Sequence, residues 1–258
     1  MSEVTPVKTG SFIDQFEGLY PGVWHLFYGP DGSGKTLGCL IIALSFLKTY
    51  PDKHVVYVVT ESVSAFNERK MCEKLVSRFG LPAGVLERVV FVDGFTGTAS
   101  LHDFFLGREK GRGLADLAKR FNVGVLVVDS LTKFYSKEVG RAPQAFREAA
   151  IYGAKYFHVW YDHVGEVMKA VGAFPVMVTA WLASSRIAQA LKKPSEQDVD
   201  KAFSDEEGEE GPREFVGGKH VAHLCKIRYR VMRKGFVMTY TQTRGPFMGK
   251  SVQVQVPV

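Results

Sequence analysis

Long hydrophobic runs, a signal-type N-terminus and paired cysteines are all missing from this 258-residue sequence. No apolar stretch reaches the roughly 18 residues that a membrane-spanning helix needs, so we expect no membrane contact. Residues 1–10 lack the apolar core of a signal peptide, which predicts a cytoplasmic protein. The three cysteines lie far apart among apolar neighbours, which favours buried thiols in a reducing compartment over a metal or disulfide cluster: Cys39, Cys72 and Cys225.

The sequence also has no strong excess of either charge and very little asparagine. Its net charge of +6 is modest and favours an anionic partner only weakly. Asparagine occurs only at Asn67 and Asn122, a scarcity that is typical of thermophilic proteins. A hydrophobic fraction of 46% is enough for one large core. We therefore expect a short N-terminal lead-in over residues 1–20 and a single domain over residues 21–258.

A glycine-rich motif covers residues 29–36. It matches G-x-x-x-x-G-K-[ST], the phosphate-binding loop of nucleotide hydrolases, with Gly29, Pro30, Asp31, Gly32, Ser33, Gly34, Lys35 and Thr36. The apolar run 24–28 predicts a strand before it, and the helical spacing of 36–47 predicts a helix after it. The glycines permit a tight turn that points backbone N–H groups at phosphate, and the helix dipole adds attraction. We expect Lys35 to reach the β- and γ-phosphates and Thr36 to hold Mg²⁺; an ordinary strand-to-helix turn is the alternative.

The rest of the chain alternates apolar strands with helices. Uninterrupted apolar runs separated by helical segments indicate an α/β fold with a mostly parallel central sheet and helices on both faces. Near the C-terminus the residues alternate in character, which predicts an antiparallel hairpin and an edge strand. The predicted strands are 24–28, 54–60, 88–92, 123–129, 174–179, 222–232, 236–243 and 252–256, and the predicted helices are 36–47, 66–79, 101–106, 114–121 and 142–171.

Two carboxylates stand at the ends of predicted strands. Asp129 ends the apolar run 125–128, and beside a phosphate loop such an aspartate can accept a hydrogen bond from Mg²⁺-bound water. Glu61 follows the second strand, where a carboxylate can orient and deprotonate a water in line with the γ-phosphate. The alternatives are a turn residue for Asp129 and a helix-initiating residue for Glu61.

These motifs, taken in order, resemble the ATPase core of the RecA superfamily, and within it the archaeal RadA recombinase and its shorter RadB-type paralogues. Residues 57–61 are similar to the family's Y-I-D-T-E, and residues 66–69 are similar to F-R-P-E-R. The likeness runs collinearly from about Trp24 to the C-terminus. The further matching segments are 29–36, 127–132, 178–179, 217–219, 222–223 and 233–235.

The resemblance implies a RecA-like P-loop fold that binds ATP and Mg²⁺. It implies that Glu61 is the water-activating base and that Arg69 packs its guanidinium on the adenine, although Arg69 lies one residue further from Glu61 than in the family. It also implies a role in homologous recombination and DNA repair. The implied partners are single-stranded DNA, the main RadA-type recombinase and further copies of this chain.

The chain departs from the family after the fifth strand, where Thr179-Ala180-Trp181 replaces T-N-Q. Because both amides that sense the γ-phosphate are lost, we expect weak ATP hydrolysis. The core also starts within about twenty residues of Met1, without the family's N-terminal DNA-binding domain, so we expect no long filaments by that route. Alternatives are an ATP-bound adaptor of the main recombinase that does not hydrolyse, a KaiC-like or DnaB-like ATPase, and a small-molecule kinase.

Two charged segments bear on DNA binding. The stretch 194–215 is strongly acidic, which predicts a mobile surface loop, with an electrostatic gate over a basic surface as the alternative. The basic residues of the late strands are candidates for contact with DNA or a neighbouring subunit. The alternative is a solvated sheet edge that their charge protects from pairing. These candidate contact residues are Arg186, Lys226, Arg228, Arg230, Arg233 and Lys234.

Overall fold

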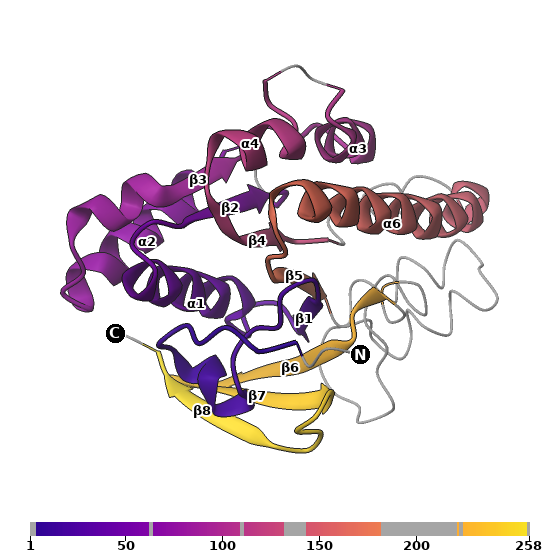
Figure 1. Cartoon of the computed structure of the whole chain (residues 1–258). Coiled ribbons are helices and arrows are strands. Elements are labelled where there is room, and N and C mark those ends of the chain that lie inside the picture. Colours follow the sequence, from indigo (N-terminus) through magenta and orange to yellow (C-terminus); the bar gives the residue numbers. More distant parts are fainter. Residues whose placement is uncertain are drawn as a thin grey trace.

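The computed structural model describes residues 4–61, 64–108, 111–131, 143–181, 221 and 224–256. In this part of the chain the strands form one eight-stranded sheet in the order β3-β2-β4-β5-β1-β6-β7-β8 (Figure 1). The strands are β1 (Trp24–Gly29), β2 (His54–Val59), β3 (Val89–Val92), β4 (Val123–Asp129), β5 (Val176–Trp181), β6 (Ile227–Lys234), β7 (Val237–Arg244) and β8 (Ser251–Gln255).

The direction of the strands confirms the predicted α/β class. All neighbours from β3 across to β6 pair in parallel. The last two pairings, β6 with β7 and β7 with β8, are antiparallel, as the alternating C-terminal segments predict. The sixth strand was predicted to begin at residue 222 but begins at Ile227, because the Cys225 N–H donates to the Val221 carbonyl instead of to a neighbouring strand.

Helices cover both faces of the sheet (Figure 1). One face carries η1 (Phe12–Phe16), α1 (Lys35–Thr49), α2 (Phe66–Arg78) and η2 (Ala83–Arg88). The other face carries α3 (Thr98–Leu106), α4 (Leu114–Arg120) and α6 (Pro143–Val171). No helix in the described ranges combines the length and the apolar character that a membrane span needs.

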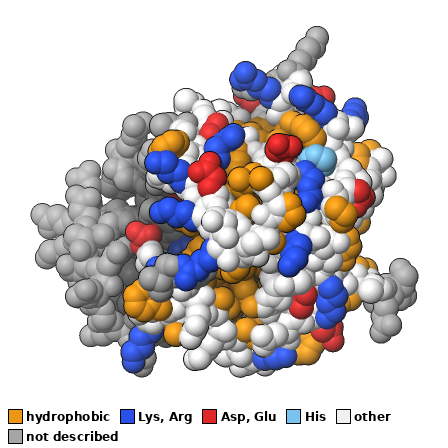
Figure 2. Space-filling model, turned by 90° about the vertical axis from the view of Figure 1, so that its left-hand side faces the viewer, with side chains coloured by type: hydrophobic (Ala, Val, Ile, Leu, Met, Phe, Trp, Pro, Cys, Tyr) orange, Lys and Arg blue, Asp and Glu red, His pale blue; other side chains and the backbone are white. Residues whose placement is uncertain are grey.

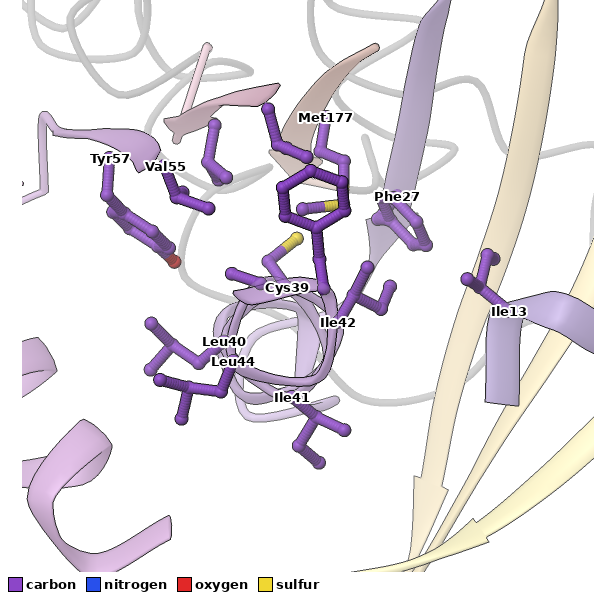
Figure 3. Packing of buried hydrophobic residues seen from close by; sticks show 14 of the residues in the cluster. Ile13, Phe27, Cys39, Leu40, Ile41, Ile42, Leu44, Val55, Tyr57 and Met177 are labelled. Carbon is purple, nitrogen blue, oxygen red and sulfur yellow. The ribbon is translucent and has the colours of Figure 1, made fainter. Parts of the chain in front are cut away.

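Successive strand residues point to opposite faces, so each buried strand contributes side chains to the core on both faces of the sheet. On β4, Val127 packs towards α1 and Val128 packs towards α6. Figure 3 looks along α1 and shows Cys39 pointing at the sheet, with Met177 and Phe27 above it. The carboxyl ends of the parallel strands consequently meet at one edge, with a packed helix on either side.

The segment predicted as a lead-in belongs to the core. Ile13, Phe16 and Leu19 are fully buried. The Phe16 ring centroid lies 5.1 Å from that of Tyr229 on β6. The N-terminal segment therefore packs against the late strands of the sheet.

Candidate nucleotide-binding site

The glycine-rich motif joins the end of β1 to the start of α1. Gly34 has φ +94°, a left-handed conformation that favours glycine, and a Cβ there would lie 2.2 Å from Met238 Sδ. A Cβ on Gly29 would lie 2.1 Å from the Val231 carbonyl oxygen. Glycine is therefore required at position 29 by the close approach of the β6 backbone, and at position 34 it is favoured by the left-handed backbone conformation.

Lys35 is folded into this loop and is only 7% exposed. Its Nζ donates to the Gly29 carbonyl at 3.0 Å and to the Pro30 carbonyl at 2.7 Å. Burial lowers the pKa of Lys35, while the nearby negative charges of Glu61, Asp129 and Asp31 oppose that change. The predicted phosphate-binding ammonium and both predicted carboxylates are therefore close enough to influence one another.

The loop offers groups that suit an anion. Ser33 Oγ is buried and has no hydrogen-bond partner among the described residues. The first N–H groups of a helix have no acceptor within the helix, and they point out of its N-terminus together with the positive end of the dipole. Thr36, half-buried at that terminus, carries a hydroxyl of the kind that Mg²⁺ accepts as a ligand. These residues fit a phosphate chain and its metal.

Asp129 ends β4 and is only 3% exposed. The Tyr57 hydroxyl donates to its Oδ2 at 2.9 Å, and the Thr179 hydroxyl donates to its Oδ1 at 2.5 Å. Burial and the neighbouring Asp129 charge raise the pKa of Tyr57 well above its usual value, so this phenol remains a donor. The carboxylate is thus held between hydroxyls from the strands on its two sides, β2 and β5.

Glu61 lies two residues beyond the end of β2 and is half-buried. The Thr60 N–H donates to the Asp129 carbonyl at 2.8 Å, which sets the ends of β2 and β4 side by side. The negative charge of Glu61 raises the pKa of Lys35, so the two groups interact electrostatically. A role for Glu61 as the water-activating base stays a prediction.

A metal at this edge would need ligands beyond the protein. Nowhere in the described part of the chain do three histidine, cysteine or carboxylate side chains gather in a way that could hold a metal ion. Mg²⁺ is usually held by one or two protein oxygens together with substrate phosphates and waters. Thr36 and Asp129 would supply these one or two protein oxygens.

Arg69 lies on the exposed side of α2, with its guanidinium carbon 5.0 Å from the centroid of the Phe91 ring on β3. The Phe91 ring lies in turn 5.5 Å from the Tyr57 ring, measured between centroids. A row of contacts therefore joins Arg69 to Asp129 through two aromatic rings. Stacking of Arg69 on an adenine stays a prediction.

Glu68 was not predicted as a site residue, yet its carboxylate interacts electrostatically with Asp129 and Glu61. Its Oε2 is buried and has no hydrogen-bond partner among the described residues. Burial raises the pKa of Glu68, a hydrogen bond to its own backbone opposes that change, and the charges of Asp129, Glu61 and Asp93 raise the pKa further. The available signal was its place beside Arg69 in the F-x-x-R-like motif.

The basic residues of β6 follow the predicted alternation. Ile227, Tyr229 and Val231 are buried, whereas Arg230 is exposed and Arg228 is half-buried. Burial and the adjacent Arg244 lower the pKa of Arg228. Lys226 precedes the strand, and Arg233 and Lys234 end it on the surface.

DNA contact by these residues stays a prediction, and two related calls, Arg186 and the acidic stretch 194–215, lie outside the described residues. The face shown in Figure 2, the left-hand side of Figure 1, spreads Lys and Arg side chains among Asp, Glu and hydrophobic ones. This face is consequently not a single basic surface.

Comparison with known proteins found no matching family model and no matching curated protein.

Proposed function

We propose that this chain is a RecA-type P-loop ATPase that binds ATP with Mg²⁺ and acts as a recombinase paralogue in homologous recombination and DNA repair. The observation that carries the proposal is the enclosure of the Lys35 amine by the Gly29 and Pro30 carbonyls, beside the carboxylates of Glu61 and Asp129. A Gly-rich turn without a phosphate role has no need of a buried cation at the meeting point of neighbouring strand ends.

Each site residue then has one role. Lys35 exchanges its bonds to the loop carbonyls for bonds to phosphate oxygens, since an ammonium group has three donors to distribute. Thr36 and Asp129 hold the metal, which neutralises charge on the β- and γ-phosphates when it is bound. Glu61 takes a proton from the attacking water, and the Arg69 guanidinium packs on the adenine.

The end of β5 supports a slow reaction. β5 lies between β1 and β4, so its last residues border the place where the γ-phosphate would lie. The Thr179 hydroxyl is already bonded to Asp129, and Ala180 is buried and apolar. Neither side chain can supply the amide donor that would stabilise charge developing on the phosphate.

This feature also favours a second candidate function, an ATP-bound adaptor that assists the main recombinase without turnover. Nucleotide would then hold one conformation of the chain, because the γ-phosphate has no side-chain amide on β5 through which hydrolysis could be coupled to DNA. Both candidates predict ATP binding, and they differ in whether phosphate is released.

Phosphate release from ATP, measured with Mg²⁺ in the presence and absence of single-stranded DNA, distinguishes the two. We expect slow release by the unmodified chain and release at the background rate by Glu61→Gln. The matched control is Glu73→Gln, the same change at an exposed position of α2, and it keeps the unmodified rate. Stimulation by DNA supports the recombinase; ATP binding with no release supports the adaptor.

A wild-type rate in Glu61→Gln would remove Glu61 from the mechanism. Phosphate transfer to a metabolite would favour a kinase instead.

A further inference from the structure

Both carboxylate oxygens of Asp129 are already engaged inside the protein. Tyr57 donates to Oδ2 and Thr179 donates to Oδ1. Tyr57, Thr179 and Asp129 are almost entirely excluded from solvent. Water therefore cannot replace either donor without a change in packing.

The strand order explains how two distant residues reach one carboxylate. β4 lies between β2 and β5, and the register pairs Val59 with Asp129 and Tyr57 with Val127. Tyr57 and Asp129 consequently share the face that packs on α1, and the long phenol reaches along β2 to the end of β4. Thr179, near the end of β5, needs only its short side chain to reach the other oxygen.

We propose that Tyr57 and Thr179 are positioning residues that fix the orientation of the Asp129 carboxylate for Mg²⁺–nucleotide. This inference rests on the proposed function, because it assigns no role to the hydroxyls without a metal near Asp129. Each carboxylate oxygen has two lone-pair directions, so a single donor on each still leaves acceptor capacity towards the phosphate loop. The two hydroxyls thereby select one rotation of the carboxylate out of those that a lone aspartate could adopt.

The packing around Tyr57 makes this orientation rigid. Its ring is fully buried and contacts the Phe91 ring, while Figure 3 shows its hydroxyl directed inwards above α1. Partners of this kind typically change metal affinity or activity by about 10- to 100-fold when they are removed. Loss of either hydroxyl should therefore weaken the advantage that Mg²⁺ gives to nucleotide binding, and leave metal-free binding unchanged.

The test measures the affinity of the full chain for a non-hydrolysable ATP analogue, once with Mg²⁺ and once with a chelator. Their ratio reports the contribution of the metal independently of turnover. We expect Tyr57→Phe and Thr179→Val each to reduce this ratio by about tenfold or more, and Thr179→Ser, which keeps a hydroxyl, to restore it. The apo melting temperature of each variant is recorded alongside, since a purely structural role would change only that.

Tyr229→Phe is the matched control. Tyr229 is also fully buried, and its hydroxyl accepts from Gln242 Nε2 at 3.4 Å, away from Asp129. We expect this variant to alter the melting temperature at most. The inference is overturned, and the proposed function left intact, if Tyr57→Phe and Thr179→Val both keep the ratio of the two affinities while Asp129→Asn loses it. Absence of Mg²⁺-dependent binding in the unmodified chain would overturn both.

Discussion

At the scale of single residues, the surroundings of Lys35 and His25 show how burial and charge oppose each other. Lys35 loses water but gains two carbonyl acceptors and nearby carboxylates, so its positive charge is matched on several sides. His25, on β1, is fully buried, and burial is the main influence on its pKa. Its Nε2 accepts the Tyr20 N–H at 3.0 Å. The charged form of the first residue has partners, whereas the second is held neutral.

The neutral state of His25 predicts a pH dependence of stability. Burial lowers the pKa of His25 from 6.5 to about 3. Between these values the unfolded chain binds a proton that the folded chain does not, so stability falls as pH falls through this window. One such group contributes a slope of about 1.4 kcal/mol per pH unit. We expect His25→Gln to lose this part of the slope in the free energy of unfolding measured from pH 4.5 to 6.5.

Measurements above pH 7 provide the internal control for this variant. There histidine is neutral in the folded and the unfolded chain alike, and the two proteins should show equal slopes. Equal slopes below pH 6.5 as well would contradict the burial of a neutral His25.

At the scale of elements, η1 is a short segment with a large packing role. Phe16, the last residue of η1, is fully buried, and its ring lies against that of Tyr229 on β6. Removing a buried phenylalanine side chain costs about 3–5 kcal/mol of stability. We expect Phe16→Ala to lower the free energy of unfolding by that amount in denaturant titrations.

Phe236→Ala makes the same substitution at a side chain that is 60% exposed. We expect it to change stability by no more than about 0.5 kcal/mol. Equal effects of the two variants would show that η1 does not belong to the cooperative core.

The polar face of β6 gives a prediction about DNA. If Arg228 and Arg230 neutralise phosphates of single-stranded DNA, each contact contributes about 0.7 to the slope of log affinity against log salt concentration. The double variant Arg228→Ala/Arg230→Ala should therefore flatten that slope by about 1.4. The double variant Lys74→Ala/Arg78→Ala removes the same charge from the exposed side of α2 and should keep the slope. An unchanged slope in the β6 variant would exclude phosphate contact by Arg228 and Arg230.

Elements differ in how far their sequence predicts them. β4 was predicted over 123–129 and has these bounds, because a fully apolar run ends at a charged residue. The start of β6 was missed because the alternating pattern continues backwards beyond Ile227, whereas the Cys225 N–H donates to the Val221 carbonyl instead of to a neighbouring strand. Residues 11–20 are too few for a periodic pattern, so the burial of Phe16 had no signal in the sequence.

At the scale of the whole molecule, the order of the strands creates the candidate site. Lys35, Glu61 and Asp129 are far apart in sequence but meet because β1, β2 and β4 run in the same direction and end at one edge. The motifs predicted that these residues would meet. They did not predict the two hydroxyls on Asp129, because sequence alone does not say that β2 and β5 are the neighbours of β4.

The central claim is that the loop at the head of α1 binds a triphosphate with the help of Lys35, and direct titration of ATP with Mg²⁺ tests it. We expect saturable binding by the unmodified chain, binding reduced by at least tenfold in Lys35→Ala, and unchanged binding in Lys48→Ala, an exposed lysine in the last turn of the same helix. Absence of ATP binding, or equal binding by the two lysine variants, would contradict the account.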